Sequence, residues 1–252
     1  MTTPSEFQLP LHVRPLKYSL TLSPDLERFT FKGEETVEVE ITERTNEVAL
    51  NAIDIQVQTA AVRLGDGTTV TPEETRYDES AETVTFVFGS QLPVGQAQFE
   101  LAFTGELNDR LHGFYRSIYT AADGAERTLA TTQFEATDAR RAFPCWDEPA
   151  LKASFEVTLV IPSQLSAVSN TPIAGEIPEG PGTKRVQFRE TPLMSTYLLA
   201  FIVGDLEYVE GMSSAGTAIR VWTTRGKAEQ GRYALEVAIR LLDYYNDYFG
   251  IP

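Results

Sequence analysis

Hydrophobic and polar residues alternate along most of the chain, from Tyr18 to about Thr224. In the segment 37–41, Val-Glu-Val-Glu-Ile, the period of two puts apolar side chains on one face of a strand and charges on the other. This pattern predicts a half-buried antiparallel strand. Similar runs rich in β-branched or aromatic residues predict strands at Glu47–Leu50, Ile55–Leu64, Thr83–Phe88, Gln98–Phe103, Phe155–Ile161, Val186–Phe188 and Ile219–Trp222.

Turn-forming residues separate these runs. Gly65-Asp66-Gly67 predicts a hairpin turn, because glycine tolerates the positive φ of tight turns. The segment 175–182 holds glycines and prolines so densely that we expect a long surface hairpin loop without regular structure. Many short strands with such punctuation favour a mainly β fold, an antiparallel sandwich or barrel-like architecture.

The period changes from two to 3.6 after Arg225. Apolar residues spaced at i, i+3, i+4 and i+7 predict an amphipathic helix over Ala228–Phe249, with Gly250 as a left-handed cap and Pro252 preventing continuation. Its wide apolar face needs more partners than a preceding β-domain supplies. We therefore expect a β-domain over residues 1–206, then a strand and this helix opening a second domain that the chain does not complete.

Composition limits the function classes. The 252 residues carry a formal net charge of −15, which disfavours nucleic acid and anionic membranes as partners, because a binder of phosphates must neutralise their charge with Lys and Arg. We attribute the acidity to solubility, with a weak attraction for cationic ligands such as peptide N-termini. The hydrophobic share of 42% and the charged share of 23% are ordinary for globular proteins.

Cysteine usage and hydropathy favour a cytoplasmic location. Cys145 is the single cysteine, so no intramolecular disulfide can form. The segment 1–11 shows no basic stretch followed by an apolar run, as a secretory signal would. The longest apolar stretch, Tyr197–Val203, is much shorter than the roughly 20 residues that a membrane-spanning helix needs.

Catalytic motifs are missing from the sequence. Besides its acids, the chain offers His12, His112 and Cys145 as zinc ligands, without an HExxH pair, so we expect no metal site. No Gly-x-Ser-x-Gly turn accompanies either histidine, and no glycine-rich phosphate loop precedes a helix. Cys145 lacks a neighbouring His or Lys to activate it and is predicted to be a buried, inert thiol. We expect no catalytic residue in this chain.

The segment 131–149 is the unusual one. If it is extended, Gln133 and Glu135 project from one face and Phe134 from the other. An amide beside a carboxylate suits a peptide N-terminus, because the ammonium group has three donors for the carboxylate. The alternative is that Glu135 forms an ion pair with Arg140 or Arg141, and from the residues alone this alternative is the simpler one.

The remaining charges of this segment predict structural roles. Thr137 and Asp138 look like a cap on a short helical turn, and Asp147-Glu148-Pro149 looks like a turn. Arg140 and Arg141 are expected to make ion pairs that hold the loop.

At this segment the chain resembles the zinc aminopeptidase family (gluzincins) that includes aminopeptidase N and the puromycin-sensitive enzymes. The similarity rests on several blocks in the same order, which are Leu9–Tyr18, Gly113–Ser117, Gln133–Arg140, Phe143–Pro149, Met194–Phe201 with Gly204-Asp205, Trp222–Thr224 and Tyr248–Pro252. These blocks cover nearly the whole chain.

The resemblance implies a fold and a function. Residues 1–206 would be an N-terminal β-domain of sandwich or saddle-like form, and 207–252 the first strand and helix of a truncated thermolysin-like catalytic domain. Gln133 and Glu135 would bind substrate, with Glu135 holding the free α-amine of a peptide. The full-length parent would use zinc to polarise the scissile carbonyl and to activate water, whereas this chain, which lacks the zinc motif, would bind none and be inactive alone.

Two other function classes compete with this interpretation. One is a stand-alone, non-catalytic β-sandwich module that binds a protein or peptide; the apolar face of the predicted helix argues against it, since a self-sufficient module has little use for such a surface. The other is a hydrolase of a different kind, which the shortage of His and Cys disfavours. The partners we expect are peptides with a free N-terminus and the missing catalytic domain.

Overall fold

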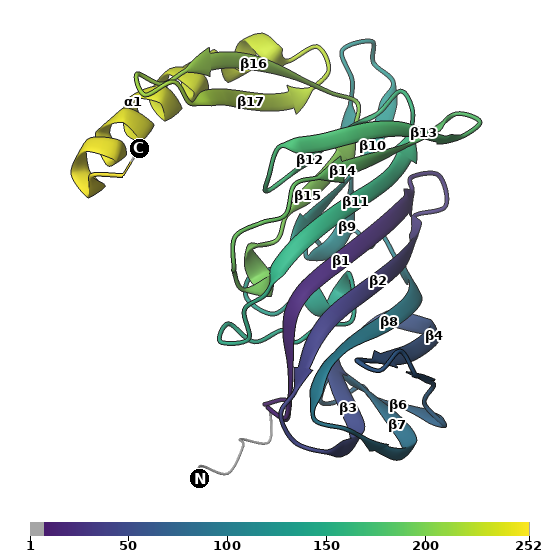
Figure 1. The fold of residues 1–252 in the computed structure, drawn as a ribbon. Coiled ribbons are helices and arrows are strands. Elements are labelled where there is room, and N and C mark those ends of the chain that lie inside the picture. The colour runs from purple at the N-terminus through teal and green to yellow at the C-terminus, as the bar shows by residue number, and fades with distance from the viewer. Residues whose placement is uncertain (1–7, 252) are drawn as a thin grey trace. The chain divides into compact units, whose positions relative to one another are not determined.

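The computed structural model describes residues 8–251 (Figure 1). The chain divides into unit 1, which comprises residues 1–117, 130–163 and 167–203, and unit 2, which comprises 118–129, 164–166 and 204–252. Residues 1–7 of the predicted β-domain, and Pro252 with its predicted role after the helix, lie outside the described residues.

A large mixed sheet is the framework of unit 1, and β1, β2 and β8 run side by side in it (Figure 1). Its order is β13-β14-β11-β1-β2-β8-β4-β5. The strands span Val13–Asp25 (β1), Thr30–Ile41 (β2), Ile55–Leu64 (β4), Thr69–Val70 (β5), Gly95–Glu106 (β8), Ser154–Pro162 (β11), Ile173–Gly180 (β13) and Thr183–Phe188 (β14). β1 pairs with β2 antiparallel but with β11 parallel, so the sheet is mixed.

Two smaller sheets pack on the buried face of the large one. The first has the order β3-β7-β6, with strands Thr45–Asn51, Thr83–Leu92 and Glu74–Asp78. The second has the order β12-β15-β10-β9, with strands Ser166–Ser169, Phe201–Gly204, Glu126–Gln133 and Gly113–Thr120. Phe86 of β7 meets Phe99 of β8 edge to face at 5.0 Å, and Phe31 of β2 meets Phe114 of β9 at 5.2 Å. The predicted mainly β fold is confirmed.

The glycine-rich segments behave in two ways. The turn at Gly65-Asp66-Gly67 is confirmed, since the Gly67 N–H donates to the Leu64 carbonyl at 2.9 Å and closes the connection from β4 to β5. The prediction that 175–182 lacks regular structure is wrong. Residues 173–180 form edge strand β13, which pairs with β14. An edge position tolerates Pro178, and Gly182 at φ +78° provides the tight turn.

Unit 2 contains a two-stranded ribbon and the helix. The ribbon consists of β16 (Leu206–Met212) and β17 (Ala218–Thr224), followed by the 3-10 turn η3 (Ala228–Gly231) and α1 (Arg232–Phe249). A Cβ on Gly211 would lie 2.8 Å from Ile239 Cδ1, so glycine permits close contact between ribbon and helix. The predicted helix is confirmed, and Gly250 caps it at φ +65°. The assignment of 207–252 to a catalytic domain stays a prediction.

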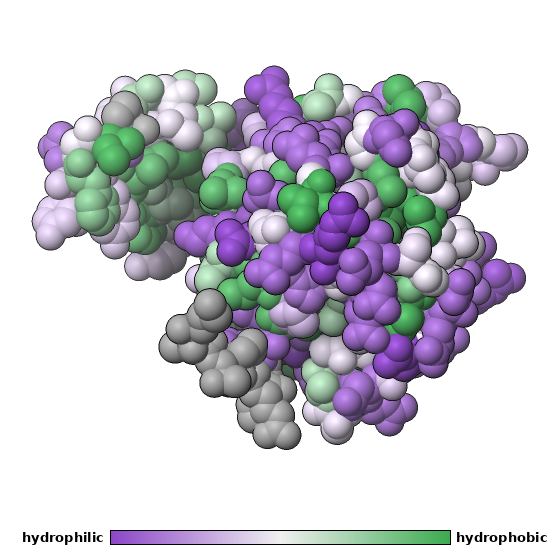
Figure 2. Space-filling view, turned by 60° about the horizontal axis from the view of Figure 1, so that its bottom comes forward, coloured by the Kyte–Doolittle hydropathy of each residue, from purple (hydrophilic) through white to green (hydrophobic). Residues whose placement is uncertain are grey.

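Large apolar side chains remain uncovered on α1. Tyr233, Tyr248 and Phe249 are 78%, 69% and 64% exposed. Hydrophobic residues (green) are visible on this part of unit 2 in Figure 2. Among residues 8–251, no helix is both long enough and apolar enough to traverse a bilayer.

Glu35 breaks the apolar pattern of the buried face. It lies between Leu20 of β1 and Leu101 of β8 and is 3% exposed. Neither carboxylate oxygen has a hydrogen-bond partner among the described residues. Burial therefore raises the pKa of Glu35 well above its ordinary value of 4.5.

We predict that Glu35 makes the stability of the protein depend on pH. Because its pKa is higher in the folded than in the unfolded state, the unfolded chain binds fewer protons between the two values. The free energy of unfolding should fall as pH rises from the ordinary glutamate pKa through the higher folded pKa. Urea unfolding measured across pH should show this loss, and Glu35→Gln should abolish it.

The exposed neighbour Glu34 supplies the matched control, since Glu34→Gln should retain the wild-type pH dependence. Glu35→Leu should raise the free energy of unfolding at neutral pH by about 1–3 kcal/mol, because it removes an unsatisfied buried polar group. Equal pH profiles for the wild type and Glu35→Gln would contradict the prediction.

Candidate functional site

The candidate site begins where β10 ends. Gln133 is the last residue of this strand, and both Gln133 and Glu135 are exposed, whereas Phe134 between them is 2% exposed. The Gln133 side-chain amide donates to the Glu135 carbonyl at a long 3.4 Å. The peptide bond between Glu135 and Ala136 is cis. The exposed polar pair and the buried phenylalanine follow the alternation that the sequence predicts.

Aromatic packing holds Phe134 in place. Its ring meets Phe143 at 6.1 Å and Phe201 at 5.9 Å, both in tilted edge-to-face arrangements. The strand carrying it is paired, since Ala130 and Thr131 of β10 face Val203 and Ile202 of β15. The backbone on the N-terminal side of Glu135 is therefore fixed by sheet and core together.

A short 3-10 turn, η1 (Ala139–Arg141), follows the polar pair. Asp138 occupies the N-cap position as predicted, but its side chain caps no backbone N–H. Instead, the Asp138 carboxylate accepts a hydrogen bond from Arg141 Nε at 2.8 Å and lies 3.1 Å from His112 Nδ1. The Asp138 N–H donates to the Phe134 carbonyl at 2.9 Å, which closes the turn around Glu135.

Both arginines hold the loop, as predicted, and each has one partner near it in sequence and one far away. Arg140 Nε donates to Asp147 at 3.0 Å, and its Nη1 donates to Glu82 at 3.0 Å. Arg141 Nη1 donates to Asp54 at 2.7 Å. Within residues 8–251, neither arginine forms an ion pair with Glu135. The simpler alternative, an ion pair between Glu135 and one of these arginines, is therefore wrong.

Asp147 is the most buried acid of the segment, with a side chain 1% exposed. Its second oxygen accepts the Thr196 hydroxyl at 2.6 Å, and its N–H donates to Asn51 Oδ1 at 3.1 Å. Sequence reasoning did not identify Thr196, Asn51 or Glu82, since no local pattern links them to this loop.

Cys145 is fully buried, and its burial raises the pKa of the thiol well above the ordinary value. The predicted burial of the thiol is confirmed, whereas its inertness stays a prediction.

The potential zinc ligands do not come together. His12 Nε2 lies 3.3 Å from the Glu47 carbonyl, His112 lies beside Asp138, and Cys145 is in the core. The described residues include no group of three His, Cys, Asp or Glu side chains able to hold a metal ion. The residues present therefore do not fit a zinc site.

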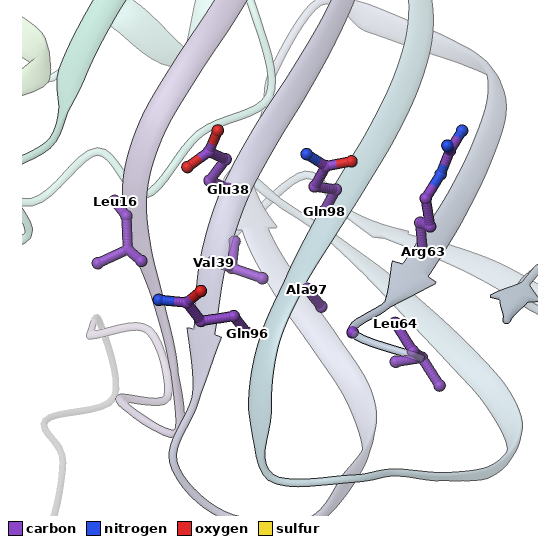
Figure 3. A pocket seen from close by; sticks show the side chains of 9 residues that line it. Leu16, Glu38, Val39, Arg63, Leu64, Gln96, Ala97 and Gln98 are labelled. Atoms are coloured by element: carbon purple, nitrogen blue, oxygen red, sulfur yellow. The ribbon is translucent and has the colours of Figure 1, made fainter. Parts of the chain in front are cut away.

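A surface pocket of about 260 Å³ lies elsewhere in unit 1. Figure 3 shows Glu38 on β2, Gln96 and Gln98 on β8 and Arg63 on β4 around it. Neither Gln133 nor Glu135 lines this pocket. The candidate site is thus an exposed polar edge on rigid support, and this chain does not enclose it.

Comparison with known proteins gives consistent matches. Residues 14–198 match the family model described as Peptidase M1 N-terminal domain. The chain is 46% identical over 254 residues to aminopeptidase M1-B of Oryza sativa subsp. japonica, covering 99% of this chain and 28% of the relative. It is 40% identical to the puromycin-sensitive aminopeptidase of Caenorhabditis elegans, covering 97% of this chain and 26% of the relative. It is 39% identical to aminopeptidase N of Acetobacter pasteurianus, covering 97% and 67%.

The chain thus spans 28% of the length of the rice relative and 26% of the nematode one.

The ion pairs predict stability effects of very different size for two substitutions in the loop. Glu135→Ala should change the free energy of unfolding by no more than about 0.5 kcal/mol, because Glu135 is exposed and forms no ion pair with another residue of 8–251. Arg140→Ala should lower it by about 3–5 kcal/mol, because it leaves the buried Asp147 carboxylate without its cation. Thermal and urea unfolding of the two variants would measure this difference, and a destabilised Glu135→Ala protein would contradict the prediction.

Proposed function

Since this chain belongs to the Peptidase M1 N-terminal domain family, we propose that it is the part of a zinc-dependent aminopeptidase that holds the free N-terminus of a peptide substrate. One observation carries the proposal. Glu135 presents an exposed carboxylate that no cation of residues 8–251 neutralises, while the backbone on both sides of it is held in place.

The chemistry of the pair suits a peptide α-ammonium group. This group offers three N–H donors and a positive charge, and a carboxylate is the strongest acceptor that a side chain provides for them. The Gln133 amide can serve a backbone group of the same substrate. An internal peptide residue has no such cation, so it would leave the carboxylate unpaired once the site is desolvated. This difference would select for exopeptidase substrates.

We assign the hydrolytic step to parts of the complete protein beyond these residues. Zinc, when bound there, would supply Lewis-acid activation of the scissile bond. The names of the relatives support the activity, and their greater length supports additional parts. In this proposal the uncovered apolar face of α1 contacts those parts, and the protein works in the cytoplasm.

The test is the kinetics of Glu135→Ala in the complete gene product. Losing a charge-assisted hydrogen bond is worth ~1.5–3 kcal/mol, so kcat/KM for an aminoacyl p-nitroanilide should fall by roughly one to two orders of magnitude. KM should rise if the ammonium is bound equally in the ground and transition states. If the contact also orients the scissile bond, kcat should fall as well.

Glu79→Ala is the matched control, because Glu79 is also an exposed acid of unit 1, in the turn between β6 and β7. Its kcat/KM should equal that of the wild type. Unchanged kcat/KM in Glu135→Ala would refute the proposed role of Glu135. A complete gene product that binds peptides but cleaves none, even with added zinc, would favour the stand-alone binding module.

A further inference from the structure

The loop that carries Glu135 depends on one buried carboxylate beyond the polar pair. Asp147 lies 12 positions after Glu135 in the sequence, and its side chain is 1% exposed. One of its oxygens accepts Arg140 Nε at 3.0 Å, and the other accepts the Thr196 hydroxyl at 2.6 Å. Its carbonyl accepts Arg140 Nη2 at 3.3 Å. A single residue thus ties η1 to a segment near β15.

The connection from Asp147 back to Glu135 is continuous. Arg140 belongs to η1, and the turn before it is closed by the hydrogen bond from the Asp138 N–H to the Phe134 carbonyl. The Phe143 N–H donates to the Ala139 carbonyl at 3.2 Å, so the backbone on the C-terminal side is closed as well. The position of Arg140 therefore limits where the backbone of Glu135 can lie.

We propose that Asp147 is a positioning residue for substrate binding, which acts through Arg140 to fix the backbone that presents Glu135 to the substrate's ammonium group. This inference rests on the proposed function. Asp147 touches no substrate in this scheme. Its role follows from geometry, because the charge-assisted contact between Glu135 and the ammonium group loses strength when the Glu135 carboxylate is displaced, even by a short distance.

The test is a double-mutant cycle in the complete gene product. Asp147→Asn keeps the shape of the side chain but removes its charge, so the contact with Arg140 loses its ionic component, while the Thr196 hydroxyl can accept from the new amide. The variant should lower kcat/KM for an aminoacyl p-nitroanilide by roughly 10- to 100-fold, mainly through KM. In a Glu135→Gln background the same substitution should change kcat/KM less than about twofold, because the charge-assisted contact that it positions has already lost its charge.

Two further variants separate positioning from loss of stability. Thr196→Val removes the hydroxyl that holds the Asp147 carboxylate and leaves the ion pair between Arg140 and Asp147. Because Asp147 is then held less firmly, this variant should shift KM in the same direction, and it provides the test even if Asp147→Asn does not fold. Val186→Ala opens a cavity in β14 and should lower the melting temperature without changing KM. Equal losses in kcat/KM from Asp147→Asn in both backgrounds would overturn the proposal.

Hydrogen exchange provides a readout that needs no activity. In Asp147→Asn, the amides of residues 134–143 should exchange faster than in the wild type, whereas Val186→Ala should leave them unchanged relative to the rest of unit 1. Unaltered exchange in Asp147→Asn would overturn the positioning role. If Glu135→Gln has wild-type kcat/KM while Asp147→Asn shows faster exchange, the proposed function is refuted and the role of Asp147 in fixing the loop is not.

Discussion

A continuous series of aromatic contacts connects the strands of unit 1 and stabilises its core. Its rings follow one another at centroid distances from 4.9 to 6.1 Å. In order, they are Phe155, Tyr18, Phe143, Phe134, Phe201, Phe114 and Phe31. The series starts on β11, crosses to β1, passes through the loop after β10, and returns by β15 and β9 to β2. Aromatic rings bury large areas and prefer edge-to-face contacts, so each ring restricts the next.

The candidate site takes its rigidity from this series. Phe134 is one of its middle members, and its buried ring leaves Gln133 and Glu135 on the opposite side of the backbone. The arginine contacts then fix the loop from its other end. An exposed carboxylate on a flexible loop would lose conformational entropy on binding, whereas one held by core and ion pairs is already ordered. Core packing and the arginine ion pairs therefore fix the backbone that presents the polar pair.

The sequence predicted the strands and the helix that depend on the local spacing of apolar residues. It did not predict the features that depend on contacts between segments far apart in the chain. The bounds of β4, Ile55–Leu64, followed from alternation, and the end of the helix at Phe249 followed from the capping glycine Gly250. The edge strand β13 was missed because its glycines and prolines resemble a loop, and only pairing with β14 makes it a strand. The partner of Arg140 at Glu82 is 58 positions away, and no residue pattern marks that distance.

The position of β1 within the large sheet has a consequence for the order of folding. Lys17–Leu22 of β1 pair in parallel with Ser154–Leu159 of β11. During synthesis, β1 can form its hairpin with β2 early, but its other edge must wait until β11 has been made. Such long-range pairing slows folding, because the chain loses conformational entropy on closing the loop before the stabilising contacts form. One edge of β1 is unpaired meanwhile, so the nascent chain is vulnerable to aggregation until residues 154–159 have been made.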